Sequence, residues 1–110
     1  NHDLDDGIRA GLFTVEDVAA AVPFVADCWA TVVARWPGVT ARRRLVPELV
    51  REQIGRMAAD LLATTRARLA AIDARSVADV RAAGRTLAGL SDGLAAEVGV
   101  LKDFLRAHMY

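Results

Sequence analysis

The chain has few of the residues on which many structural and metal sites depend. Among its 110 residues only Cys28 is cysteine and only two are histidine, so no internal disulfide can form and the Cys and His spacings of zinc sites are absent. A lone cysteine fits a reducing compartment, and we expect a cytoplasmic location. No apolar run approaches the roughly twenty residues that a membrane helix needs, so we expect no membrane partner.

An excess of charge of one sign is also absent. The chain carries 14 basic and 14 acidic residues and has a formal net charge of zero. It therefore lacks the basic field that is typical of a dedicated nucleic-acid binder, and we expect no nucleic-acid partner. Lys102 is the only lysine, because every other basic residue is arginine.

Strand signals are missing as well: there is no sustained alternation of branched residues and no Asn-Gly turn. Helical periodicity with plausible caps is present instead, and the predicted fold class is all-α. The expected helical segments are 1–11, 14–21, 23–35, 40–72, a short helix from Ser76, and a final amphipathic helix over 91–110. The stretch 84–90 is expected to be irregular or briefly extended.

The helix predicted over 40–72 is long for a chain of this size. At 1.5 Å per residue it would span roughly 50 Å, whereas a compact domain of this length has a radius of gyration of about 13 Å. Part of its apolar stripe is expected to pack on further chain or on a second subunit, so we expect a homo-oligomer. The chain lacks an initiator Met and ends within a helical pattern, so we expect 1–110 to be one helical segment of a larger protein.

Two features of the middle of the chain have alternative interpretations. Arg42, Arg43 and Arg44 fall early in the long helix, where cations are unfavourable with respect to the helix dipole. They form either a solvated or subunit-contacting patch or, less favoured, an anion site for a nucleotide. Trp29 and Trp36 are interpreted as core or interface anchors, since large aromatic side chains bury well.

The first eleven residues are unusually rich in charge. Helical spacing places Asp3, Asp6 and Gly7 on one face, and Leu4, Ile8 and Leu12 on another. Gly11 is expected to close the helix in the left-handed conformation that glycine accepts without strain. A solvated acidic helix end would account for the same residues, and a substrate-facing site is the alternative.

This opening segment, Asn-His-Asp-Leu-Asp-Asp-Gly-Ile-Arg-Ala-Gly, resembles the N-H-D-x-D-D-x-x-R-x-G stretch of the bacterial deoxyguanosine triphosphate triphosphohydrolases. That family is the dNTP-cleaving branch of the HD-domain metal-dependent phosphohydrolases. The last ten residues resemble the family's L-K-x-F-L-x-x-x-V-Y segment, with Met109 where a branched residue is usual.

The resemblance implies roles for residues at both ends of the chain. It places Lys102 near the substrate triphosphate and Tyr110 against the deoxyribose, where the ring would exclude a ribose 2′-hydroxyl, while Asp3 would accept from the 3′-hydroxyl. Arg106 lies between Lys102 and Tyr110 at spacings of four residues, and we include it among the candidate substrate contacts. Without the resemblance, Lys102 and Arg106 would be interpreted as an ordinary solvated face paired with Asp103 and its neighbours, and Tyr110 as a residue at the rim of an amphipathic helix.

The resemblance also implies a reaction and a cofactor. The reaction is hydrolysis of a dNTP to a deoxynucleoside and inorganic triphosphate by water activated by a divalent metal such as Mg²⁺ or Mn²⁺. His2 and His108 do not form a metal-ligand pattern with each other, and His2-Asp3 is not the His-Asp pair that names the superfamily. The metal ligands are expected upstream of Asn1, so we expect no catalytic residue within the chain.

A different class of function remains open. An α-helical ligand-binding and dimerisation domain of a transcriptional regulator would use Trp29, Trp36 and the long helix to line an apolar cavity. Such a domain would not need the acidic opening segment, and that segment favours the enzyme.

Overall fold

Every regular element that the structure describes is a helix. The computed structural model describes residues 1–72, 75–82 and 87–110. The elements are α1 (His2–Arg9), α2 (Val15–Ala21), α3 (Pro23–Arg35), the 3-10 helix η1 (Arg42–Leu45), α4 (Val46–Ala71), α5 (Val77–Ala82) and α6 (Asp92–Met109). The all-α prediction is confirmed, and within these ranges no helix combines the length and apolar character that a bilayer span requires.

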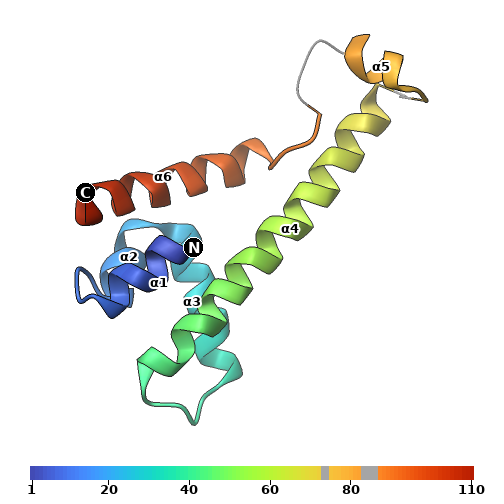
Figure 1. Ribbon diagram of the computed structural model, residues 1–110. Coiled ribbons are helices and arrows are strands. Elements are labelled where there is room, and N and C mark those ends of the chain that lie inside the picture. Colours follow the sequence, from blue (N-terminus) through green and yellow to red (C-terminus); the bar gives the residue numbers. More distant parts are fainter. Residues whose placement is uncertain (73–74, 83–86) are drawn as a thin grey trace.

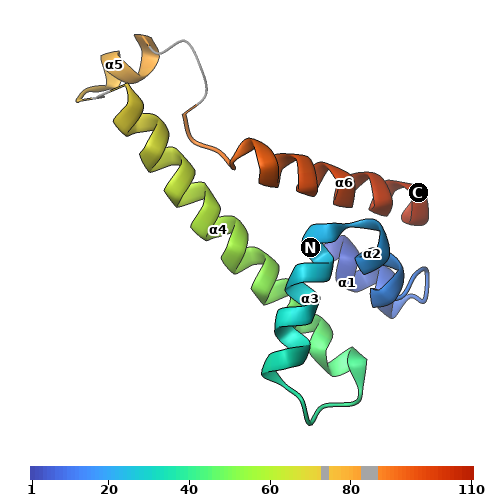
Figure 2. The ribbon, with the colours of Figure 1, turned by 180° about the vertical axis from the view of Figure 1, so that it is seen from behind.

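The helices form a packed end and an extended arm. α1, α2 and α3 lie together with α6 across them, while α4 runs away from this group towards α5 (Figures 1 and 2). The radius of gyration is 17.0 Å, against about 13 Å for a compact domain of this length. The core lies in the packed end and consists of Leu4, Phe13, Val15, Val18, Val22, Phe24, Val25, Cys28, Val46, Leu49, Leu101, Phe104 and Leu105.

The short helices begin and end where their residues predict. Gly11 has a φ of +74°, just beyond the end of α1. The Thr14 hydroxyl accepts from the Asp17 amide while the Asp17 carboxylate accepts from the Thr14 amide, so α2 has a complete capping box. α3 starts at Pro23 and ends before Trp36, as predicted.

The long helix is confirmed as α4, and it begins at Val46 after the 3-10 turn formed by Arg42–Leu45. Pro47 lies in its first turn, where the missing amide costs no internal hydrogen bond. Further along α4, Ile54, Leu61 and Leu62 are exposed. The expected uncovered apolar stripe is therefore present on the arm.

Polar side chains connect α4 to its neighbours. The Glu52 carboxylate accepts from Arg56 and from Arg35 of α3, both at 3.0 Å, and these two bonds lower the pKa of Glu52. Arg56 also donates to the Thr31 hydroxyl at 2.7 Å. These contacts fasten the near half of α4 to α3.

The segment after α4 is described only in part. The short helix predicted from Ser76 is present as α5. The stretch 84–90, predicted to be irregular or briefly extended, lies partly outside the described residues, and its described part, 87–90, is not helical. The final helix runs over Asp92–Met109, with the Ser91 hydroxyl accepting from the Leu94 amide as its cap.

Candidate functional site

The two ends of the chain meet at the packed end of the molecule. The Tyr110 hydroxyl donates to the Asp3 carboxylate at 3.3 Å, so residues 107 positions apart lie side by side. Tyr110 is 83% exposed, and Asp3 is exposed as well. The pair is therefore on the surface and open to a ligand.

Packing between α1 and α6 holds this pair in place. Leu4, which follows Asp3, is fully buried in the core that α6 reaches through Leu101 and Leu105. Beyond α1, the Phe13 ring packs edge-on against Phe104 of α6 with centroids 5.2 Å apart. Asp3 and Tyr110 thus come from two helices that share one apolar core.

The other predicted substrate contacts lie further back along α6. Lys102 is exposed and, among the described residues, takes part in no ion pair, whereas Arg106 pairs with Asp103 at 3.7 Å. Eight residues of helix separate Lys102 from Tyr110 by about 12 Å along the axis. Of the four candidates, the structure thus brings only Asp3 and Tyr110 into contact with each other.

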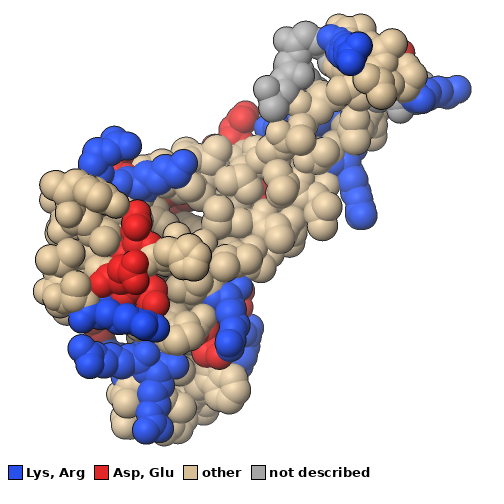
Figure 3. Space-filling view, in the orientation of Figure 1, with Lys and Arg blue, Asp and Glu red and all other residues tan. Residues whose placement is uncertain are grey.

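Acidic side chains gather over α1, with basic side chains on both sides of them (Figure 3). Asp6 is exposed, as its predicted face requires, and half-buried Asp5 forms an ion pair with Arg9 at 3.1 Å. The other two carboxylates of α1, those of Asp3 and Asp6, lie on its predicted polar face.

Two residues of the predicted faces are placed differently. Gly7 is buried, because the ring of Phe13 occupies the space where a Cβ would lie. It therefore belongs to the core side of α1 and not to the Asp3 face. Leu12 is 50% exposed, because the chain has left the helix before that position and the helical spacing no longer applies.

Sequence reasoning missed a buried polar contact beside the site. Gln53 of α4 is fully buried and donates to the Asn1 side chain at 2.7 Å. Its own carbonyl oxygen has no hydrogen-bond partner among the described residues. A polar residue at the i+4 position from Leu49, within the apolar stripe, was the signal that pointed to this contact.

Sequence reasoning also missed the position of His108. Its ring stacks on Phe104 with centroids 4.0 Å apart, and its Nδ1 lies 2.8 Å from the Phe104 carbonyl oxygen. The spacing of four residues was the available signal. His108 is thus engaged with its own helix.

The described residues do not fit a metal centre. They include no group of three or more His, Cys, Asp or Glu side chains placed to hold an ion. The acidic face of α1 adds only carboxylates that are exposed or paired with arginine. No chemical step through a metal follows from this chain.

The two tryptophans line different hollows. Trp29 borders one with Val33 and Arg42, while Trp36, 44% exposed, borders another with Glu48. Trp29 packs against the core as an anchor. Neither of these hollows is lined by both tryptophans, although the two hollows share Val39 and Leu45.

Comparison with known proteins identifies relatives over the whole chain. A deoxyguanosinetriphosphate triphosphohydrolase-like protein of Parvibaculum lavamentivorans is 48% identical over 110 residues, which are 100% of this chain and 27% of the relative. Proteins of the same name from Azoarcus and Jannaschia are 44% and 41% identical, again over 110 residues, with 28% and 27% of their lengths covered. Over its whole length this chain is therefore similar to one part of the deoxyguanosinetriphosphate triphosphohydrolase-like proteins.

The similarity extends through the middle helices of the chain as well as its two motif-bearing ends. The chain spans about a quarter of the length of these relatives. No family model matches it, and no solved structure matches it.

Proposed function

We propose that the protein hydrolyses a deoxynucleoside triphosphate to the deoxynucleoside and inorganic triphosphate, and that this chain forms one wall of the nucleotide site. The names of the relatives support the reaction class. The observation that carries the proposal is the hydrogen bond from Tyr110 to Asp3, because it joins the two segments that resemble the dNTP-cleaving family.

In this proposal Asp3 and Tyr110 bind the sugar. The Asp3 carboxylate accepts from the 3′-hydroxyl, which takes the place of the Tyr110 hydroxyl as its donor. The Tyr110 ring packs against the sugar and leaves no room for a 2′-hydroxyl. A carboxylate left without its donor would disfavour analogues that lack the 3′-hydroxyl.

Lys102 and Arg106 bind the phosphates in this proposal. Lys102 carries a compact, mobile cation without a partner in the described part of the chain. Arg106 is held by one long ion pair with Asp103, from which it can turn to a ligand. The divalent ion that the family resemblance implies would be held by residues outside this chain, and the protein would act in the cytoplasm as a homo-oligomer.

Product analysis tests the proposal. The intact protein is incubated with Mg²⁺ or Mn²⁺ and each dNTP, with the matching rNTPs as controls. The expected products are tripolyphosphate and a deoxynucleoside, with the rNTPs spared. Release of monophosphate or diphosphate, or no hydrolysis with either metal, would contradict it.

A further inference from the structure

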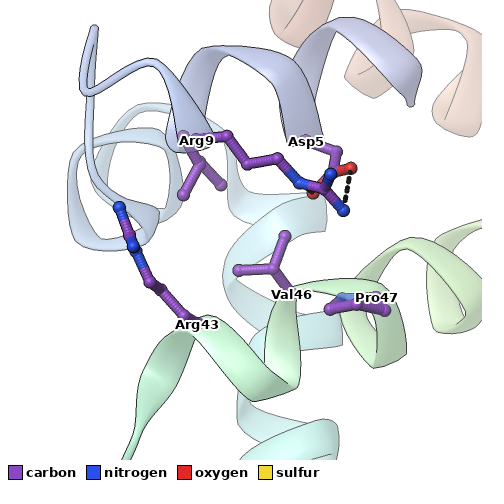
Figure 4. A pocket seen from close by; sticks show the side chains of 6 residues that line it. Asp5, Arg9, Arg43, Val46 and Pro47 are labelled. Atoms are coloured by element: carbon purple, nitrogen blue, oxygen red, sulfur yellow. Dashed lines mark hydrogen bonds and ion pairs between the residues drawn. The ribbon is translucent and has the colours of Figure 1, made fainter.

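A cavity outside the candidate site lies between the second half of α1 and the start of α4 (Figure 4). It has a volume of about 290 Å³ and is lined by Asp5, Ile8, Arg9, Arg43, Val46 and Pro47. A neighbouring hollow of about 350 Å³ shares Ile8, Arg43 and Val46 with it. Arg43 therefore borders both openings.

The charges around this cavity do not cancel. Arg9 donates to the Asp5 carboxylate at 3.2 Å, and this pair is close to neutral. Arg42, which borders the neighbouring hollow, is paired with Glu16. Arg43 has no ion-pair partner among the described residues, so the lining of the cavity itself carries one net positive charge. In the neighbouring hollow Asp17 is also present, and its carboxylate accepts from the Thr14 amide at the start of α2.

The backbone adds to the attraction for an anion. Val46 and Pro47 form the first turn of α4, a helix of 26 residues, so the positive end of its dipole lies at the cavity. The guanidinium of Arg43 offers paired donors that match the oxygens of a phosphate. Both features favour a phosphate group at the mouth of the cavity.

The rest of the lining is apolar. Ile8 is half-buried, Val46 is 3% exposed, and both contribute hydrocarbon surface together with Pro47. Such a surface can bind a ring or a short hydrocarbon chain but makes no favourable contact with a bare inorganic ion. The lining therefore suits a phosphate that carries an apolar group.

We propose that this cavity, the Arg43 site, binds a small organic phosphate. Its phosphate lies against Arg43 and the start of α4, and its apolar part lies on Ile8, Val46 and Pro47. The Arg43 site is separate from the Asp3 and Tyr110 pair, because Asp3 and Asp5 are about 200° apart around α1. It does not depend on the proposed hydrolysis, since none of the sugar or phosphate contacts proposed above lines it.

Arginine-directed labelling tests the Arg43 site residue by residue. The intact protein is treated with phenylglyoxal with and without phenyl phosphate, and modification is measured on peptides by mass spectrometry. Arg44 is the internal control, because it is adjacent and exposed but borders a different hollow, with Trp36 and Glu48. Phenyl phosphate should slow the modification of Arg43 at least fivefold and leave the modification of Arg44 unchanged. Inorganic phosphate should give the same protection only at about tenfold higher concentration, since it buries no ring.

Two matched variants give a second readout. Calorimetric titration with phenyl phosphate, without divalent metal, is expected to show binding at least tenfold weaker in Arg43→Ala and within twofold of the parent in Arg44→Ala. Equal protection of both arginines, or equal loss of binding in both variants, would show only general attraction of anions and would overturn the proposal. Unchanged binding in Arg43→Ala would overturn it as well.

Discussion

At Gly7 the backbone of α1 comes directly against an aromatic ring. An added Cβ would lie 2.3 Å from the nearest atom of Phe13. The ring cannot turn aside freely, because it is 4% exposed and packs edge-on against Phe104. We expect Gly7→Ala to destabilise the protein by about 1–3 kcal/mol, the usual range for overpacking, as measured by urea unfolding.

The matched control is Gly55→Ala in the middle of α4, where an added Cβ meets nothing within 4 Å. Alanine stabilises an open helix interior by about 0.5–1 kcal/mol relative to glycine. The two substitutions should therefore shift the urea midpoint in opposite directions. A shift of the same sign for both would show that the contact at Gly7 does not control stability.

The Cys28 thiol should be inert in the folded protein. Cys28 is fully buried, and burial raises the pKa of its thiol from an ordinary 9.0 to about 11, although the charge of Arg56 acts in the other direction. At pH 8 this lowers the thiolate fraction about 100-fold. Labelling with a chromogenic disulfide should be at least that much slower in native protein than in urea, with Cys28→Ala identifying the Cys28 signal. Similar labelling rates in the native protein and in urea would contradict the expectation that the Cys28 thiol is inert.

Single residues could be predicted from sequence where the requirement is local. Gly11 was identified because the left-handed conformation at a helix end depends only on neighbouring residues. The environments of Gln53 and Gly7 could not be predicted, because they are formed by Asn1 and Phe13, whose positions depend on how whole helices pack.

At the scale of the helices, hydrogen bonds between Asp60 and Ser91 connect α4 to the start of α6. The Asp60 carboxylate accepts from both the amide and the hydroxyl of Ser91, each at 2.7 Å, and these bonds lower the pKa of Asp60. A pKa lowered on folding means that the unfolded chain binds more protons, so the contribution of Asp60 to stability rises with pH. It is fully present above the unfolded pKa of about 3.9 and is lost as the pH falls through the lower folded value.

The variant Asp60→Asn tests how much this contact contributes to stability. The variant should be less stable than the parent at neutral pH, because an amide accepts these two bonds less strongly than a carboxylate. The difference should shrink as the pH falls below about 3.9. Thermal unfolding of both proteins between pH 2 and pH 7 measures this, and a difference that is constant across that range would exclude a charged Asp60 as its cause.

The helices themselves were more predictable than their contacts. Cap residues and periodicity located α2, α3 and α6, since each helix carries its own start and stop signals. The start of α4 was less visible, because Arg42–Leu45 has helical spacing but forms a 3-10 turn. On α6, Phe104 packs against Phe13, a partner that sequence spacing cannot identify.

At the scale of the whole molecule, the exposed apolar side chains of α4 are out of keeping with an isolated chain. Leu62 is 57% exposed and Ile54 is 51% exposed, on an arm that the other described helices leave uncovered. If this surface joins copies of the protein, as the expected homo-oligomer requires, Leu62→Glu should lower the sedimentation coefficient. Ala67→Glu, about 140° further around the same helix, should not. Equal behaviour of the two variants would remove α4 from the interface.

The candidate site depends on the whole fold more than on either motif. The two segments could be identified from sequence because their spacing resembles that of a known family. The contact between Asp3 and Tyr110 could not be predicted from sequence, because it depends on α1 and α6 sharing the core around Leu4 and Leu105. Lys102 was assigned to the triphosphate by the resemblance alone, and the structure gives it no ion-pair partner in the described part of the chain.

The contact between the chain ends leads to a test of sugar selection. Tyr110→Ala in the intact protein removes the ring that is proposed to exclude a 2′-hydroxyl, so the ratio of rNTP to dNTP turnover should rise by about tenfold or more. Tyr110→Phe keeps the ring and loses only the bond to Asp3, so it should retain the preference for dNTPs. Initial rates with paired dNTP and rNTP substrates measure both. If Tyr110→Phe relaxes selection as much as Tyr110→Ala, the hydroxyl and its bond to Asp3, rather than the bulk of the ring, discriminate between the sugars.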